Sequence, residues 1–138
     1  MNRSVSTKMG MKEGVRTLLV HAPKEAIADM DLPPLDIATR RGGQFEYIHL
    51  FIKTKQEFTE QFPKLKEHLA PTGKLWVSWP KNGQLNTDLS LTTIIHLGYD
   101  YDLVESTCLS INSTWSALKF THPKRGKTYH NKYGKLPE

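Results

Sequence analysis

A chain of 138 residues with 38% hydrophobic content can close one hydrophobic core, and it is too short for several domains. Its longest apolar runs fall well short of the roughly 20 residues that a membrane-spanning helix needs, and from its polar beginning we expect no secretory signal. The net charge is +5, and the single cysteine, Cys108, excludes an internal disulfide, so we expect a cytoplasmic protein with no membrane partner.

We expect one α/β domain over residues 12–121, between a loose N-terminus at residues 1–11 and a basic, flexible tail at residues 122–138. No internal repeat or low-complexity linker divides the chain. Four of the five excess positive charges lie in the tail, together with two tyrosines. Such a mixture is typical either of a solubilising tail or of a segment that contacts phosphates and stacks on bases.

The first half of the domain alternates between strand and helix. Residues 15–20 are rich in β-branched and aliphatic side chains and predict a first strand. Residues 24–30 predict a short helix, and residues 35–39 a second strand. Residues 45–53 are almost continuously apolar, which is typical of a central parallel strand that is covered on both faces.

The middle of the chain predicts a crossover between two strands. Residues 55–69 carry apolar side chains at helical spacing, and we expect Pro63 to kink the helix. Residues 70–73 have the composition of a helix stop, and residues 74–79 predict the next strand. Strand, helix and strand in this order predict a right-handed parallel crossover.

The end of the domain predicts a helix and a hairpin. Thr87-Asp88 has the composition of a helix start, and the helix is expected to run to Leu97. Residues 102–109 and 114–121 predict two strands, which a short polar segment joins into an antiparallel hairpin. The predicted fold class is therefore α/β, with a small Rossmann-like, mostly parallel sheet that ends in a C-terminal antiparallel hairpin.

This order resembles methyltransferase-like Rossmann folds, in which a strand and a helix precede two final strands, the last inserted antiparallel. Residues 65–77 resemble the helix, turn and strand that follow the substrate strand in that superfamily. More narrowly, Trp79-Pro80-Lys81, Thr87-Asp88-Leu89 and Thr114-Trp115-Ser116 resemble motifs of an uncharacterised bacterial domain-of-unknown-function family. Members of that family carry an acidic pair where this chain has Asn112-Ser113, so no role of those acids transfers. The resemblance implies the fold and no reaction.

The two features by which this superfamily binds S-adenosylmethionine (SAM) are missing from the sequence. A glycine-rich turn after the first strand lets the cofactor approach the backbone, but this chain has His21-Ala22-Pro23-Lys24-Glu25 there. A carboxylate after the second strand binds the ribose hydroxyls, but this chain has Arg40-Arg41 near that point. We therefore expect no cofactor, and SAM-dependent methyltransferase activity is disfavoured.

Ligands of open α/β sheets bind outside the carboxyl ends of the strands. The residues that follow the predicted strands are mostly cationic, which favours a small anion. The candidate ligand-binding residues are Lys53, Lys81, Arg40, Arg41, Thr87, Asp88, Trp79 and Trp115. The alternatives are solvated loop charges, capping of a helix by Thr87 and Asp88, and core packing of the tryptophans. No catalytic residue is identified, and the histidine spacing predicts no metal site.

We interpret the chain as a noncatalytic binding or interaction domain on a degenerate methyltransferase-like scaffold, with a small anion at the strand ends or a protein partner as its ligand. The alternatives are an enzyme acting on a small anionic substrate and nonspecific nucleic-acid binding through the basic tail. No nucleophile motif or phosphate-binding loop is present. His49, within the apolar strand, is interpreted as a hydrogen-bonded core histidine rather than a catalytic base.

Overall fold

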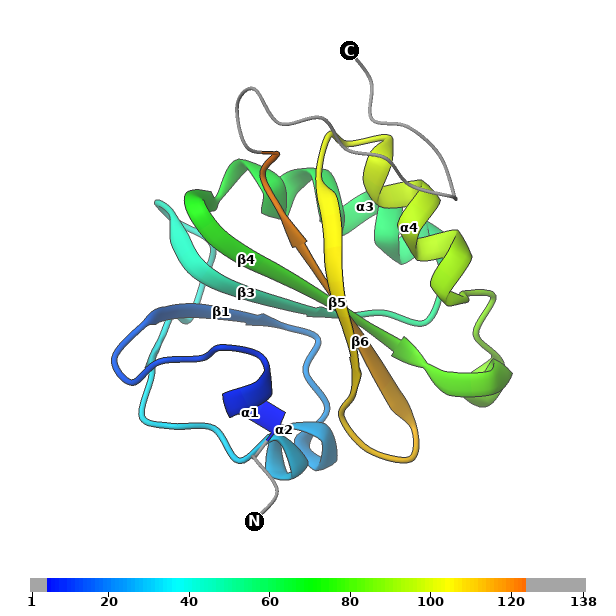
Figure 1. Ribbon diagram of the computed structural model, residues 1–138, viewed down its shortest axis with the longest axis horizontal. Helices are drawn as coiled ribbons and strands as arrows, with labels where there is room; N and C mark the ends of the chain where they lie inside the picture. The colour runs from blue at the N-terminus through cyan, green and yellow to red at the C-terminus, as the bar shows by residue number, and fades with distance from the viewer. Residues whose placement is uncertain (1–4, 124–138) are drawn as a thin grey trace.

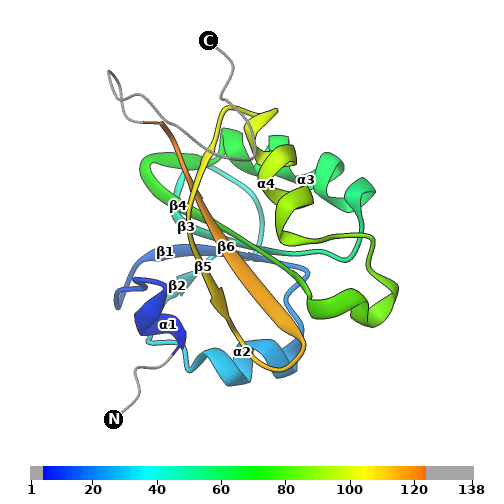
Figure 2. The same ribbon diagram turned by 45° about the vertical axis from the view of Figure 1, so that its right-hand side comes forward.

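The computed structural model describes residues 5–123, which form one six-stranded sheet with helices on both faces (Figures 1 and 2). The strands are β1 (Arg16–Val20), β2 (Asp36–Ile37), β3 (Phe45–Phe51), β4 (Leu69–Pro80), β5 (Val104–Ser110) and β6 (Trp115–Thr121). The helices are α1 (Val5–Lys8), α2 (Lys24–Met30), α3 (Lys55–Glu67), the 3-10 segment η1 (Lys81–Asn86) and α4 (Leu91–Tyr99).

The strand order is β2-β1-β3-β4-β6-β5. The first four strands in this order run parallel, and β6 runs antiparallel to both of its neighbours, β4 and β5. The last strand of the chain, β6, is thus inserted between β4 and β5. Its antiparallel pairing with β5 is the predicted hairpin. The predicted fold class, a mostly parallel Rossmann-like sheet with a C-terminal antiparallel hairpin, is confirmed.

Strand β3 shows why the sheet is covered on both faces. Its side chains alternate, so that Ile48 and Leu50 join one apolar cluster with α3 and α4, while Tyr47 and Phe51 join the other with α2. All four side chains are buried. The continuous apolar pattern that predicted a central strand therefore reflects one core on each side of β3.

Helix α3 is the predicted amphipathic crossover, with Pro63 inside it. The buried residues along its inner stripe are Phe58, Phe62 and Leu65. The helix ends at Glu67, and residues 70–73, predicted as a stop, belong to β4 instead. The reason is that Leu69 already pairs with Phe45 of β3, after which an irregularity shifts the register.

Helix α4 begins and ends later than predicted. Its N-cap is Ser90, whose side-chain oxygen accepts a hydrogen bond from the backbone N–H of Thr93. Gly98 lies within the helix and does not end it. A Cβ atom at this position would lie 2.1 Å from Cε1 of Phe120, so glycine permits the close packing of α4 on β6.

The N-terminal boundary also differs from the prediction. Residues 5–11, expected to be loose, include α1 and add the buried side chains of Met9 and Met11 to the core cluster on the α2 face. The hydroxyl of Ser6 donates a hydrogen bond to the carbonyl of Asp31 over 2.7 Å, which ties the segment to the end of α2. The predicted basic tail lies almost wholly outside the described residues, so binding through it stays a prediction.

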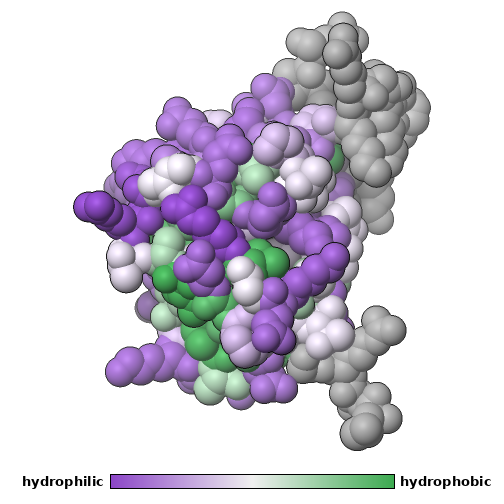
Figure 3. All heavy atoms as spheres, turned by 90° about the vertical axis from the view of Figure 1, so that its left-hand side faces the viewer, coloured by the Kyte–Doolittle hydropathy of each residue, from purple (hydrophilic) through white to green (hydrophobic). Residues whose placement is uncertain are grey.

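The two edges of the sheet differ in length. Strand β2 has two residues and leaves the side chain of Ile37 49% exposed, whereas β5 has seven residues. Figure 3, which views the molecule from the left-hand side of Figure 1, shows a group of apolar side chains surrounded by polar ones on that side. Within residues 5–123, no helix combines the length and the apolar run that crossing a bilayer requires.

Candidate functional site

A cavity of about 710 Å³ lies at the carboxyl ends of β1 and β3, beside the first residue of β6. We call it the strand-end cavity. Its lining residues are His21, Pro23, Glu25, Phe51, Ile52, Lys53, Glu57, Leu85 and Trp115. This is the edge at which open α/β sheets bind their ligands, because the loops that leave parallel strands diverge there.

The turn from β1 to α2 forms one wall of the strand-end cavity. His21 adopts a left-handed backbone conformation, with φ at 56°, which side-chain-bearing residues rarely take and glycine takes freely. Pro23 then precedes α2 in an extended conformation. The turn therefore makes the sharp left-handed bend that a glycine would allow, although the sequence contains no glycine there.

Glu57 presents a fixed carboxylate to the same cavity. Its backbone N–H donates to the side-chain oxygen of Thr54, the N-cap of α3, over 3.1 Å. Its Oε1 accepts hydrogen bonds from the backbone N–H of Lys53 over 3.1 Å and from the Thr54 hydroxyl over 3.3 Å. Its other oxygen, Oε2, lies 3.9 Å from Nδ1 of His21. This reciprocal capping holds the carboxylate beside the histidine.

Two aromatic side chains close the bottom of the strand-end cavity. The rings of Phe51 and Trp115 meet edge to face, with centroids 5.4 Å apart. Asn112 positions Trp115, because its Oδ1 accepts the backbone N–H groups of Thr114 and Trp115, each over 2.9 Å. The indole Nε1 of Trp115 is buried and has no hydrogen-bond partner within residues 5–123. The indole Nε1 of Trp76, in the core, is likewise buried without a partner in the described part of the chain.

The η1 segment supplies the rim of the cavity. Leu85 is 51% exposed, and its backbone takes the left-handed conformation with φ at 53°. The segment is anchored to the β5–β6 turn, because Lys81 donates its backbone N–H to the carbonyl of Thr114, and Gln84 donates through Nε2 to that of Ser113. An exposed leucine in a disfavoured conformation beside a cavity is the kind of strain that accompanies binding sites.

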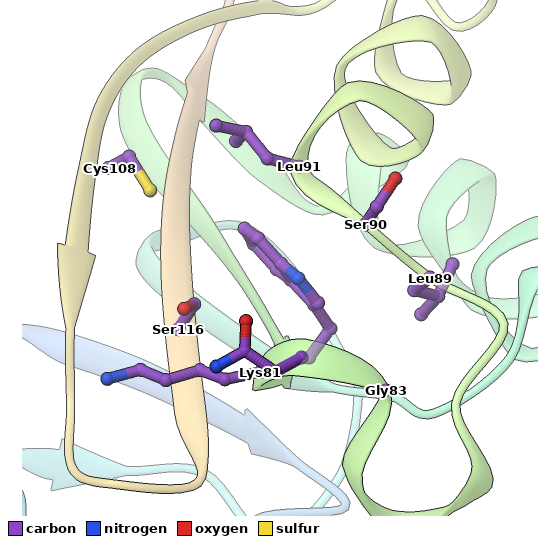
Figure 4. A pocket seen from close by; sticks show the side chains of 9 residues that line it. Lys81, Gly83, Leu89, Ser90, Leu91, Cys108 and Ser116 are labelled. Carbon is purple, nitrogen blue, oxygen red and sulfur yellow. The ribbon is translucent and has the colours of Figure 1, made fainter.

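The structure divides the predicted ligand-binding residues among separate hollows. Lys53 and Trp115 line the strand-end cavity. Trp79 and Lys81 line a second pocket of about 390 Å³, between the residues that precede α4 and strands β5 and β6 (Figure 4). Lys81 donates through Nζ to the hydroxyl of Ser110 on β5. Lys53 and Lys81, both predicted to bind a small anion at the strand ends, therefore line different pockets.

Arg40 and Arg41 also lie apart from the strand-end cavity. Arg40 is exposed, and Arg41 lines a third hollow of about 320 Å³ beside Gln61 and Lys64 of α3. The ring of cations predicted around one anion is therefore not assembled at a single place. The side chains that sequence reasoning missed in the strand-end cavity include two carboxylates, Glu25 and Glu57, and the apolar side chains of Phe51 and Leu85.

Thr87 and Asp88 hold the loop before α3, and they do not cap α4. The Thr87 hydroxyl donates to the carbonyl of Lys53 over 2.5 Å, and Asp88 Oδ1 accepts the backbone N–H of Lys55 over 2.9 Å. Thr87 and Asp88 therefore bind backbone groups at a helix start, as predicted, but the helix is α3, which precedes them in the chain, and not α4. Their contribution to the site is to fix the end of β3.

His49 lies in the core, in line with the preferred interpretation of this residue. It is fully buried, and its Nε2 lies 2.6 Å from the hydroxyl of Ser78, while its Nδ1 lies 3.4 Å from the hydroxyl of Tyr47. Burial lowers the pKa of His49 to about 3 and raises the pKa of Tyr47 well above its ordinary value. Across residues 5–123, no group of three or more metal-ligating side chains is present.

No protein-family model matches the sequence, and no curated protein matches it. Solved structures are similar in fold. Ribosomal protein L11 methylase from Lactobacillus delbrueckii subsp. bulgaricus matches with a TM-score of 0.59 and 12% identity, over 85% of this chain and 74% of that chain. A TehB-like SAM-dependent methyltransferase from Corynebacterium glutamicum matches with a TM-score of 0.53 and 8% identity, over 85% of each chain. The DhpI–SAH complex matches with a TM-score of 0.52 and 10% identity, over 86% of this chain and 72% of that chain.

These structures establish a methyltransferase-like fold and correct the functional interpretation. The predictions of a noncatalytic domain and of disfavoured methyltransferase activity are contradicted, because a methylase, a SAM-dependent methyltransferase and a protein in complex with SAH share this fold. Both predictions relied on two local features, the glycine turn after β1 and the carboxylate after β2. Neither feature determines the strand order, and the fold is what the chain shares with its structural neighbours.

Proposed function

We propose that this chain is a SAM-dependent methyltransferase whose cofactor binds in the strand-end cavity. The observation that carries the proposal is the position of this cavity at the carboxyl ends of β1 and β3, in a sheet whose fold is methyltransferase-like. The carboxyl ends of parallel strands are where this class of sheet holds its ligand. Its volume of about 710 Å³ falls within the range of small-molecule and cofactor sites.

The residues present fit the cofactor in charge and in hydrogen bonding. Glu25 and Glu57 bring negative charge to the cavity and Lys53 brings positive charge, while SAM carries positive charge on its sulfur and amino group and negative charge on its carboxylate. Phe51 and Trp115 place aromatic side chains in the lining, and aromatic rings attract cations and pack against flat rings. The cavity lining therefore favours a partly cationic ligand with a flat ring over a simple anion.

When bound, SAM supplies an electrophilic methyl group attached to positively charged sulfur. The chain contributes a low-polarity floor from Phe51 and Trp115 and an apolar rim from Leu85, which together exclude water from the reacting groups. His21 and the anchored Glu57 form a pair that can take up the proton that a hydroxyl or amine acceptor loses on methylation. The acceptor is thus proposed to carry such a group.

The finer assignments from the sequence are proposals too. The motifs Trp79-Pro80-Lys81 and Thr87-Asp88-Leu89 support membership of the uncharacterised bacterial family with this fold. Thr87 and Asp88 hold the end of β3 at the cavity, which gives the second motif a role at the site. A cytoplasmic location stays a prediction.

The test compares two half-exposed apolar residues, Leu85 at the cavity rim and Ile37 on the edge strand β2. In calorimetry, the wild-type protein is expected to bind SAM with one-to-one stoichiometry. Leu85→Ser is expected to weaken binding about fivefold, because it removes roughly 1 kcal/mol of apolar contact. Ile37→Ser removes similar exposed apolar surface outside the cavity and should leave the affinity unchanged.

Methyl transfer is then followed as SAH production from SAM, with a small-molecule extract as the source of acceptors. Leu85→Ser is expected to lower this rate at limiting SAM, and Ile37→Ser is expected to match the wild type. Failure of the wild-type protein to bind SAM at millimolar concentration would contradict the proposed function.

A further inference from the structure

The proposed cofactor needs a partner for its two ribose hydroxyls, and the usual place for that partner holds none. Strand β2 consists of Asp36 and Ile37, and the chain contains no carboxylate between Ile37 and Phe45. The charged residues after β2 are Arg40, which is exposed, and Arg41, which lines a different hollow. The group that binds the ribose in this chain must therefore come from another element.

Glu25 on α2 is the available carboxylate. It lines the strand-end cavity and forms no hydrogen bond or ion pair with any residue in the described part of the chain. Glu57, the other carboxylate of the cavity, is already engaged, because its Oε1 accepts two hydrogen bonds and its Oε2 lies 3.9 Å from His21. Both oxygens of Glu25 are thus free to accept, which matches the two O–H donors of a vicinal diol.

We infer that Glu25 binds the ribose hydroxyls of the cofactor, in place of the carboxylate that methyltransferase-like folds carry after their second strand. This inference rests on the proposed function. In this chain the carboxylate that binds the ribose hydroxyls lies on α2 and not after β2. Arg40 and Arg41, which follow β2, therefore take no part in binding the ribose. The chain therefore needs no acidic residue after β2 in order to hold an adenosine-containing cofactor.

The experiment uses two probes, SAH and 5′-methylthioadenosine. Both contain the ribose and the adenine, but only SAH carries the amino-acid end. Glu25→Gln is expected to weaken the binding of both probes by the same factor, about ten- to hundredfold, because the variant keeps the size of the side chain and loses its charge. Glu60→Gln, an exposed position on α3 outside the cavity, is the matched control and should bind both probes like the wild type.

Arg41→Ala tests the original position and should leave both affinities unchanged. Circular dichroism is expected to show a wild-type fold for Glu25→Gln, because Glu25 is exposed. Loss of SAH binding alone would mean that Glu25 contacts the amino group, and this would overturn the inference. If Glu25→Gln binds both probes as tightly as the wild-type protein does, the inference is overturned as well, but the proposed function still stands because the wild-type protein binds SAH. A wild-type protein that binds neither probe would overturn both.

Discussion

Two histidines, His49 in the middle of β3 and His21 just after the end of β1, have opposite surroundings. His49, in the middle of β3, is fully buried, has a polar neighbour at each ring nitrogen, and stacks on Phe51 with ring centroids 4.2 Å apart. His21 lies at the strand-end cavity, keeps half of its side chain exposed, and faces the carboxylate of Glu57. The first arrangement completes a core, and the second leaves a titratable group available to a ligand.

The two regions are connected through Phe51. One face of its ring stacks on His49, and the ring also meets the edge of Trp115 in the floor of the cavity. The hydrogen bond between His49 and Ser78 links β3 to β4 beneath that floor. A buried polar pair with satisfied partners makes the site rigid, so the interior acts on the ligand only by holding the aromatic wall in place.

The largest expected effect is a loss of stability in acid, which is caused by His49. Burial lowers the pKa of His49 from its ordinary 6.5 to about 3 in the folded protein. Between pH 6.5 and pH 3, His49 is therefore protonated in the unfolded chain and neutral in the folded chain. The free energy of unfolding should therefore fall by about 1 kcal/mol for each pH unit as the pH drops from 6.5 towards 3. Above pH 6.5 the contribution of His49 should be constant.

Urea titrations of the wild type and of His49→Gln across this pH range provide the measurement. The variant cannot take up the proton in either state, so its stability should fall less steeply with acid, although it is expected to be about 2 kcal/mol less stable near neutral pH because the ring packing is lost. Parallel curves for the two proteins would show that His49 does not titrate differently on unfolding.

A smaller effect on stability is expected from the backbone of His21, in the wall of the strand-end cavity. Because its φ of 56° suits glycine, His21→Gly should be more stable than His21→Ala by about 1 kcal/mol. The matched control is Ala22, the next residue in the turn, which is not among the residues with positive φ. There, Ala22→Gly should destabilise the protein by about 0.5–1 kcal/mol. Thermal unfolding of the four proteins gives the comparison, and an alanine variant at position 21 as stable as the glycine variant would argue against the left-handed turn.

Most of the fold could be predicted because local patterns determine it. The spacing of Phe58, Phe62 and Leu65 defines the inner face of α3, and the polar turn after β5 predicts the hairpin. The errors lie where tertiary contacts decide. Residues 70–73 lie within β4, at the irregularity between the pairs Phe45–Leu69 and Tyr47–Lys74, although their composition is that of a turn. Gly98 permits the close packing of Phe120 and does not end a helix.

The site was harder to predict, because being next to a strand end does not determine which way a side chain faces. Lys53 and Lys81 each follow a strand, yet they line different pockets. Glu25 and Glu57 reach the cavity from helices α2 and α3, and only the parallel pairing of β1 with β3 brings the starts of those helices to the same end of the sheet. One signal was readable in the sequence, the capping pair Thr54 and Glu57.

The most direct measurement follows the indole N–H signals of the three tryptophans in a two-dimensional NMR spectrum during titration with SAH. Trp115 lines the strand-end cavity, Trp79 lines the second pocket, and Trp76 is fully buried in the sheet. Binding in the strand-end cavity predicts a large, saturable shift of the Trp115 signal while the Trp79 signal stays in place. A shift confined to Trp79, or no shift of any indole signal at millimolar SAH, would contradict the account.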